Sequence, residues 1–332
     1  MSNSALVQQV KQGAQEVTAT AIPVLSEGEV LVRIDSAGLN PVDWKIVKYG
    51  IFLQSWPTVL GSDGSGVVTE VAPGVTSHKV GDRVFFQARI GDIKTSTFQQ
   101  YAAIRSNLAA RLPGNISFEQ GATLGVAGIT AALGLFKVLK FAAPFTPGAL
   151  EANKGKLVLI WGGSTSVGHV ATQLANLAGL TVIVTASPQY HDKLKTLGAT
   201  YTIDYRAADV VQQIAAVTQG KLFAAFDTTG PGSQASFDSL SATEPSILAV
   251  INEAKVTNQD AFANRSIQSF LGSSYVDIDF AAHFWLWVST VLEAGKLVPL
   301  ETKVIGGLDA IVAAQADQIA GKVSSVKLIA KP

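Results

Sequence analysis

Alternating apolar and polar positions predict short strands in the first third of the chain. Residues 29–37 alternate as a half-buried strand does, and shorter runs follow at 66–71, 81–86 and 98–103, with glycines between them. Strands at this spacing, with turns between them, are typical of a small β-barrel or sandwich. We therefore expect the chain up to Ser117 to be rich in β-structure.

The pattern becomes helical at Ser117. Ser117 and Gln120 have the spacing of a capping box, and the apolar stretch that follows predicts a helix through Leu139. From Lys156 onward, strands alternate with helices, which predicts a parallel, doubly wound α/β sheet. The expected strands are 156–161, 181–186, 201–205, 223–228, 246–251 and 267–271, and the expected helices are 167–178, 190–197, 208–217 and 283–294.

The end of the chain is predicted to return to the first domain. Residues 323–329 alternate like a strand, and a lone terminal strand needs a sheet to join. We therefore expect one domain from residues 1–118 and 296–332, and a dinucleotide-binding domain from residues 119–295.

A glycine turn joins the first strand of the α/β region to its helix. A strand, a tight turn and a helix start form an anion site, because the backbone can approach a phosphate and the helix dipole favours its charge. The turn departs from G-x-G-x-x-G at its second glycine, which Thr165 replaces. We expect hydroxyl groups there to meet the phosphates, although an ordinary glycine corner would show the same pattern. The expected cofactor residues are Gly162, Gly163, Ser164, Thr165, Ser166, Val167 and Gly168.

The end of the second α/β strand bears on the choice of nucleotide. An acidic residue there would bind the ribose hydroxyls of NAD, whereas small polar residues leave room for the 2′-phosphate of NADP. The sequence from Thr185 to Tyr190 has no carboxylate, so we predict NADP(H). Ser187 is then the phosphate donor, with Tyr205 or Arg206 beside the adenosine. The alternative is that Asp192 reaches back to a ribose and the cofactor is NAD.

Composition narrows the function classes. The 332 residues suffice for roughly two domains, 48% are apolar, and 25 basic residues balance 25 acidic ones. This balance argues against binding to nucleic acid or to an anionic membrane. The chain has no cysteine, which excludes disulfides and thiolate chemistry, and its four histidines have no metal-ligand spacing. Apolar runs such as 284–288 are shorter than the ~20 residues of a membrane span, and no leader pattern precedes them, so we expect a cytoplasmic protein.

Several motifs in order resemble the medium-chain dehydrogenase/reductase superfamily across the whole chain. They are Gly38-Leu39-Asn40-Pro41-Val42-Asp43-Trp44-Lys45, Leu60-Gly61-Ser62-Asp63-Gly64, Val80-Gly81-Asp82-Arg83-Val84 and Gly306-Gly307-Leu308-Asp309-Ala310. The resemblance implies a GroES-like β-barrel domain beside a Rossmann domain. It is nearest to the zinc-independent quinone oxidoreductase and enoyl reductase branch, especially the trans-acting enoyl reductases of fungal polyketide pathways.

Both zinc-ligand positions of the related alcohol dehydrogenases are lost, because Asn40 stands where a cysteine would be and Ser62 where a histidine would be. The resemblance thus implies NADPH-dependent reduction of an activated C=C bond with no metal. Quinone reduction, or a nucleotide-binding protein without turnover, are the alternatives. The substrate is a small molecule, free or on a carrier, and the family includes monomers and homodimers.

The resemblance also suggests catalytic candidates. Lys45 would point toward the nicotinamide ribose or the substrate, or else is an ordinary surface lysine. Thr130 would place a hydroxyl near the nicotinamide, or else bonds its own helix backbone. Asn40 would donate an amide hydrogen bond or organise the turn before Pro41. Tyr49 lies near Phe52, which occupies the position of a catalytic tyrosine in mitochondrial-type relatives.

Other candidates are less specific. Asp43 is expected to be structural, as an acceptor for backbone donors. Gly272, Ser273 and Ser274 would hold the nicotinamide carboxamide through backbone groups. The pool for an apolar substrate wall, most of it expected to be core, is Trp44, Phe52, Trp56, Phe270, Phe284 and Trp285.

Overall fold

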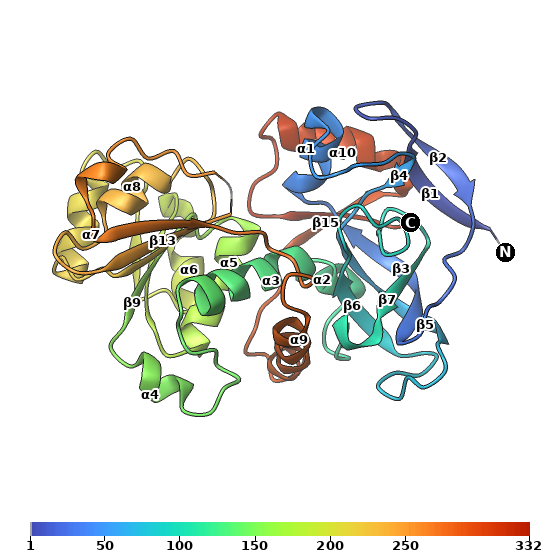
Figure 1. Cartoon of the computed structure of the whole chain (residues 1–332), viewed down its shortest axis with the longest axis horizontal. Helices are drawn as coiled ribbons and strands as arrows, with labels where there is room; N and C mark the ends of the chain where they lie inside the picture. Colours follow the sequence, from blue (N-terminus) through green and yellow to red (C-terminus); the bar gives the residue numbers. More distant parts are fainter. Residues whose placement is uncertain (1, 252) are drawn as a thin grey trace. The chain divides into compact units, whose positions relative to one another are not determined.

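The structure is a computed structural model that describes residues 2–251 and 253–332. It forms two compact units, residues 1–126 with 273–332 and residues 127–272 (Figure 1). Each unit is described by itself below. The boundaries therefore fall at 126/127 and 272/273, whereas the sequence suggested 118/119 and 295/296.

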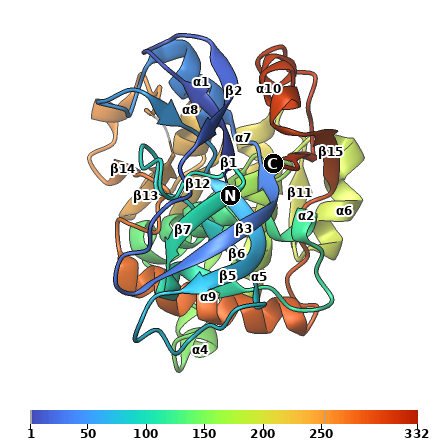
Figure 2. The same ribbon diagram turned by 90° about the vertical axis from the view of Figure 1, so that its right-hand side faces the viewer.

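The first unit contains two β-sheets. Strands β2, β1 and β4 form a small sheet, and β15, β16, β3, β5, β6 and β8 follow one another in a second sheet, in which β7 also pairs with β3 (Figure 2). The strands are β1 Asn3–Gln8, β2 Gln15–Thr20, β3 Glu29–Gly38, β4 Thr58–Val59, β5 Asp63–Val71, β6 Arg83–Gln87, β7 Tyr101–Arg105, β8 Ala109–Arg111, β15 Thr302–Gly306 and β16 Lys327–Ala330. The terminal strand β16 runs antiparallel to β3.

Four α-helices accompany these sheets: α1 Pro41–Tyr49, α2 Phe118–Gly121, α9 Ile278–Glu293 and α10 Ile311–Ile319. Helix α9, which we expected in the dinucleotide domain, packs in the first unit. The ring of Trp285 meets Phe85 edge-on at 5.6 Å, and Asn115 donates a hydrogen bond to the Leu292 carbonyl. Side-chain packing of this kind cannot be read from a helix's own periodicity.

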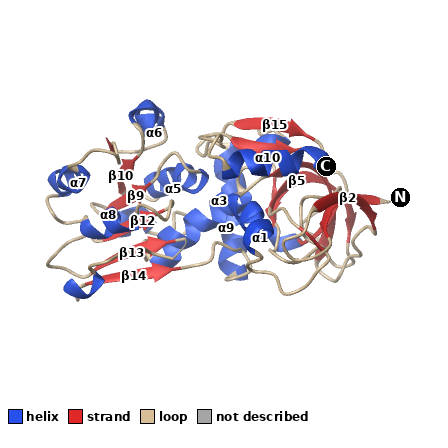
Figure 3. Cartoon of the chain, turned by 90° about the horizontal axis from the view of Figure 1, so that it is seen from above, coloured by secondary structure: helices blue, strands red, loops and turns tan. Residues whose placement is uncertain are grey.

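The second unit is the predicted parallel sheet, with strand order β11-β10-β9-β12-β13-β14 and helices on both faces (Figure 3). Every pairing is parallel. The strands are β9 Leu157–Trp161, β10 Thr181–Thr185, β11 Tyr201–Ile203, β12 Ala224–Asp227, β13 Ser246–Val250 and β14 Arg265–Ser269. The helices are α4 Ala149–Asn153, α5 Ser166–Leu177, α6 His191–Thr196, α7 Val210–Thr218 and α8 Ser233–Asp238. The predicted fold class is confirmed.

The long helix expected after Ser117 is broken. The capping box of Ser117 and Gln120 is present, but α2 ends at Gly121, α3 spans Gly125–Ala132, and a π-helix continues over Leu133–Val138. By length and composition, the run Phe118–Val138 is apolar enough to cross a membrane, contrary to our estimate of the longest apolar segment. However, 89% of the tested window is buried inside the protein, as in the core helix of a globular domain.

Candidate active site

The glycine turn in the second unit is shaped by close packing. Gly162 has φ +89°, and a Cβ on Gly163 would lie 2.1 Å from Val184. A Cβ on Gly168 would lie 2.2 Å from the Gly162 carbonyl oxygen. A side chain at Gly163 would clash with β10, and one at Gly168 would push α5 away from the turn, so the glycines bring the first turn of α5 against the end of the strand.

This arrangement leaves backbone donors free at the start of α5. Within the described chain, the N–H groups of Ser164, Ser166 and Val167 have no hydrogen-bond partner, as expected for the first turn of a helix. All three residues are partly exposed. Free amides at the positive end of a helix dipole bind anions such as a pyrophosphate, so the residues present fit a dinucleotide.

Thr165 has a different role from the one we expected. Its hydroxyl caps α5 by accepting from the Gly168 N–H at 2.9 Å. It also lies 2.9 Å from the hydroxyl of Thr228, whose proton goes to the Trp161 carbonyl. The Thr165 hydroxyl therefore bonds inside the protein, to the Gly168 N–H and to the hydroxyl of Thr228. The hydroxyls of Ser164 and Ser166 remain candidates for phosphate binding.

Polar groups lie at the end of β10. The Ser187 hydroxyl is partly exposed and has no hydrogen-bond partner among the described residues. Asp192 is fully exposed and pairs with Lys195 at 3.6 Å, so its carboxylate has a partner on its own helix.

Charged groups also follow the end of β11. The Arg206 guanidinium lies 5.7 Å from the Tyr205 ring centroid and is held by Asp204 at 3.1 Å. The side-chain hydrogen bond to Arg206 lowers the pKa of Asp204.

Thr130 and Gly272 lie against each other. A Cβ on Gly272 would be 1.9 Å from the Thr130 hydroxyl oxygen, so only glycine fits beside this threonine. The hydroxyl makes no hydrogen bond to its own helix or to any other described residue. The structural alternative for Thr130 is therefore not seen, whereas its role near a nicotinamide stays a prediction.

Ser273 and Ser274 belong to the first unit. The Ser273 hydroxyl accepts from the Tyr275 N–H at 3.3 Å, and the Ser274 hydroxyl accepts from the Trp285 indole N–H at 3.1 Å. The Ser274 N–H donates to Gln87 at 2.7 Å. Ser274 is thus bonded to α9 through its side chain, and its backbone N–H, which was expected to meet the carboxamide, is taken by Gln87.

A buried polar network is the main feature of the first unit that the sequence did not indicate. The Lys327 ammonium lies 2.7 Å from a carboxylate oxygen of Asp63 and 2.6 Å from the Asn40 amide oxygen. The Asn40 amide nitrogen in turn donates to Asp63 at 3.0 Å and to the Gly38 carbonyl. The other Asp63 oxygen accepts the Val126 N–H at the start of α3. The sequence did offer one signal of this network, because Lys327 occupies an inward-facing position of the alternating terminal strand.

Asn40 and Asp43 cap α1. Asn40 and Asp43 form a reciprocal capping box, in which the Asn40 N–H donates to Asp43 at 2.7 Å. The N–H donors of the Asn40 side-chain amide are thus used within the protein. Of the two roles expected for Asn40, this favours the structural one, in which it organises the turn before Pro41. Burial raises the pKa of Asp43 to about 7, and one of its oxygens is buried without a partner. Asp43 is therefore a structural acceptor, as its motif suggested.

Lys45 and Tyr49 lie on α1. The Lys45 ammonium lies 5.7 Å from the Trp44 ring and has no carboxylate partner within the described chain. The Tyr49 side chain is 52% exposed, and its ring centroid lies 6.2 Å from that of Trp44. The phenol is accessible, but these contacts give it no catalytic partner.

The aromatic pool separates into exposed and core residues. Phe52 is 58% exposed, and the Trp56 indole donates to Gln8 at 3.4 Å. Phe270 packs on Phe226 with ring centroids 5.8 Å apart in the second unit. Phe284 is fully buried, 4.8 Å from the Trp285 ring, so both are core residues of the first unit and we remove Phe284 from the substrate wall.

Comparisons with known proteins place the chain in a family. Family profiles match residues 26–132 (Alcohol dehydrogenase GroES-like domain) and residues 166–274 (Zinc-binding dehydrogenase). Trans-enoyl reductase ACTTS2 of Alternaria alternata is 33% identical over 100% of this chain and 99% of its own length. The chain belongs to the medium-chain dehydrogenase/reductase superfamily.

Other members of the superfamily are similar. Trans-enoyl reductase TOXD of Cochliobolus carbonum is 37% identical over 68% of this chain and 74% of its own. The crystal structure of an alcohol dehydrogenase superfamily protein from Novosphingobium aromaticivorans has a TM-score of 0.83 at 27% identity, covering 99% of both chains. The Pseudomonas syringae quinone oxidoreductase, with a TM-score of 0.80 at 23% identity over 100% of both chains, shows the shared fold. The superfamily's oxidoreductases are thus the chain's relatives.

The superfamily includes zinc enzymes, but the donor set here does not fit a catalytic zinc. The Asn40 oxygen already accepts from the Lys327 ammonium, and a second cation beside it would meet like charge. No group of three or more His, Asp or Glu residues that could hold a metal occurs among the described residues. The ammonium therefore supplies the positive charge that Asp63 requires.

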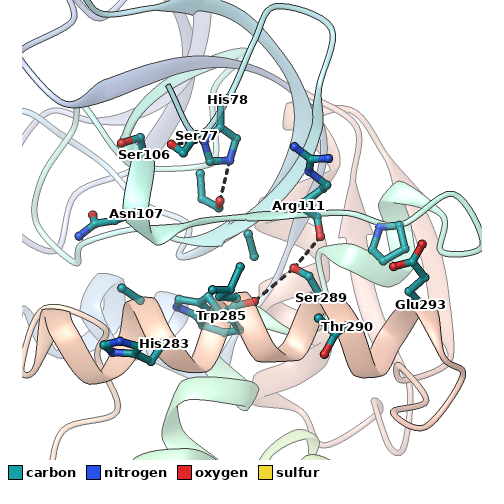
Figure 4. A pocket seen from close by; sticks show the side chains of 15 residues that line it. Ser77, His78, Ser106, Asn107, Arg111, His283, Trp285, Ser289, Thr290 and Glu293 are labelled. Carbon is teal, nitrogen blue, oxygen red and sulfur yellow. Dashed lines mark hydrogen bonds between the residues drawn. The ribbon is translucent and has the colours of Figure 1, made fainter. Parts of the chain in front are cut away.

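A pocket of about 540 Å³ lies along α9 in the first unit (Figure 4). His78 bonds to the Ala109 carbonyl at 2.9 Å and to the Ser77 hydroxyl, so both ring nitrogens are used. Ser289 donates to the Arg111 carbonyl. Since these polar groups bond to one another rather than converge on the cavity, we assign the pocket no chemistry.

Proposed function

We propose that this protein is an NADPH-dependent reductase of C=C bonds conjugated to a carbonyl group, acting without a metal ion. The observation that carries the proposal is the set of three free amides at the start of α5, beside three glycines that leave no room for side chains. The full-length similarity to a trans-enoyl reductase supports the choice of reaction.

NADPH over NADH is supported by the end of β10. Ser187 has an unused hydroxyl, and the sequence from Thr185 to Tyr190 contains no carboxylate. A neutral strand end with a hydrogen-bond donor suits a 2′-phosphate, whereas a carboxylate would repel it. Tyr205, the expected neighbour of the adenosine, lies next to the paired side chains of Asp204 and Arg206.

In this proposal, the residues of the chain bind the cofactor and the substrate and stabilise the negative charge that develops during the reaction. When bound, the cofactor supplies a hydride, which in this proposal goes to the β-carbon of the substrate. The negative charge that then develops on the carbonyl oxygen is best met by preorganised donors, for which the free hydroxyl of Thr130 and the ammonium of Lys45 are the candidates. Lys45 or water would supply the α-proton.

Turnover with a substrate panel tests the proposal. The purified protein is mixed with NADPH and an enone, an enal, an enoyl thioester or a quinone, and NADPH consumption is followed with and without EDTA. We expect turnover of at least one unsaturated carbonyl compound at a rate that EDTA does not change. Turnover of saturated alcohols alone, or strong inhibition by the chelator, would refute it.

Quinone reduction is the second candidate. The Coxiella burnetii quinone oxidoreductase is 26% identical with a TM-score of 0.76 over 99% of both chains. If only the quinone is consumed in the panel, this candidate replaces the first. Tight NADPH binding with no turnover of any member would instead indicate a nucleotide-binding protein without catalysis.

A further inference from the structure

A lysine-lined pocket lies at the amino-terminal ends of the parallel strands, and the glycine turn lies at their carboxyl ends. It has a volume of about 620 Å³, and the first residues of β9 and β12 contribute to it. The glycine turn follows the carboxyl end of β9, five residues along. At a rise of about 3.3 Å per residue the two ends of β9 are roughly 15 Å apart. The pocket is therefore separate from the proposed cofactor site.

The lining combines an apolar surface with positive charge. Its apolar members are Leu139, Phe141, Leu157, Val217, Phe223, Ala224 and Ile247. Phe223 is 42% exposed, so part of its ring is open to a ligand in the pocket. Three lysines, Lys140, Lys156 and Lys221, complete the lining, and no aspartate or glutamate contributes to it.

The three lysines are unneutralised. Among the residues that the structure describes, none of their ammonium groups pairs with a carboxylate or donates a hydrogen bond to a side chain. Lys154, one residue before the rim residue Gly155, has Glu151 as a partner at 3.6 Å, so its charge is balanced. Three uncompensated cations around one apolar cavity favour a ligand that brings negative charge and hydrocarbon together.

The rim backbone is held in an uncommon conformation. Lys140 has φ +62° and Gln219 has φ +53°, in the left-handed region that side chains disfavour. Such a residue is strained and persists where its surroundings determine it. The turns that carry Lys140 and Lys221 into the lining are thus fixed rather than adaptable.

From these observations we infer that the pocket binds an amphipathic anion, a small molecule with an alkyl or aryl group and a phosphate or carboxylate. The apolar floor takes the hydrocarbon and the lysines take the anionic group. The volume lies within the range of small-molecule sites, about 300–1,000 Å³. This inference is independent of the reaction proposed above, because it concerns the amino-terminal ends of the strands and not the carboxyl ends, where the cofactor is proposed to bind.

Calorimetric titration with decyl phosphate, below its micelle concentration, tests the inference. Decanol, which has the same chain without the charge, and inorganic phosphate, which has the charge without the chain, are the comparison ligands. We expect saturable binding of decyl phosphate that is at least tenfold tighter than that of either comparison ligand and that weakens as salt is added. Equal binding of decanol, or no saturable binding of decyl phosphate, would overturn the inference.

Two variants locate the binding. K140Q/K156Q/K221Q should weaken decyl phosphate binding about fivefold or more, because it removes all three positive charges that attract the phosphate. K255Q/K296Q/K303Q removes the same charge outside the pocket and should bind as the parent protein does. NADPH binding by both variants checks that the fold is kept.

The lysines have an alternative explanation, because Lys140 and Lys221 follow helix ends whose dipoles favour cations. If that is their whole role, K140Q/K156Q/K221Q lowers the unfolding midpoint and leaves decyl phosphate affinity unchanged. That result would also overturn the inference.

Discussion

The Lys327–Asp63 pair offers a sharp test of how the first unit is held together. Their side chains are 3% and 0% exposed, and their charged atoms are 2.7 Å apart. At an effective dielectric constant of about 20, the Coulomb attraction at that distance is about 6 kcal/mol, part of which offsets the desolvation of both ions. Replacing Lys327 with Met leaves Asp63 charged, buried and bonded only to Asn40 and the Val126 N–H.

We therefore expect Lys327→Met to lower the free energy of unfolding by about 3–5 kcal/mol. Asp63→Asn, which keeps an acceptor for Val126, should cost a similar amount because it leaves the ammonium unpaired. The double variant is neutral at both positions and should be no less stable than either single variant. Strict additivity in the double-mutant cycle would contradict this reasoning.

Urea unfolding followed by circular dichroism measures these differences. Lys322→Met is the matched control, because Lys322 pairs with Asp317 at 3.1 Å but is 69% exposed, and an exposed pair contributes about 1 kcal/mol or less. A loss below 1 kcal/mol for Lys327→Met would show that the buried pair is no stronger than this surface pair.

The remaining predictions concern the cofactor, catalysis and pH. Gly168→Ala, whose new Cβ would lie 2.2 Å from a carbonyl oxygen, should abolish NADPH binding measured by fluorescence, whereas Gly114→Ala, with nothing within 4 Å, should leave it unchanged. Ser187→Glu should weaken NADPH binding about tenfold or more relative to NADH, because a carboxylate repels the 2′-phosphate; an unchanged ratio counts against the NADPH assignment. Thr130→Val should lower kcat/KM roughly 10- to 100-fold with NADPH affinity kept, and Thr130→Ser should restore it; equal activity of both variants removes Thr130 from the site. The raised pKa of Asp43, about 7 against 3.8 for the free side chain, makes its contribution to stability largest below pH 4 and lost as pH rises to 7, so Asp43→Asn should gain stability relative to the parent across that window in melts at several pH values.

Patterns between near neighbours in the sequence predicted much of the fold. The strand-glycine-helix unit around Gly163 and the alternation after it were enough for the parallel sheet, because period and turn chemistry are local. The capping box at Ser117 was likewise visible. The break after Gly121 was not, since apolar composition alone does not distinguish one straight helix from three joined segments.

What the sequence could not supply depends on distant partners. The Thr165 hydroxyl was expected at the phosphates, but it bonds to Thr228, which the chain brings beside it only after three more strands. Lys327 meets Asp63 through the pairing of β16 with β3. Phe284 was placed in the substrate pool by residue type, whereas the fold of the first unit buries it completely. In each case the residue type was informative and its direction was not.

The reaction proposed for this superfamily member is tested most directly by the fate of the hydride. The protein, treated with EDTA, is given an enone and NADPH deuterated at the nicotinamide C4, and the product is identified by mass spectrometry and NMR. The account predicts a saturated ketone with one deuterium at the β-carbon. An allylic alcohol with deuterium at the carbonyl carbon, or loss of the reaction when metal is removed, would contradict it.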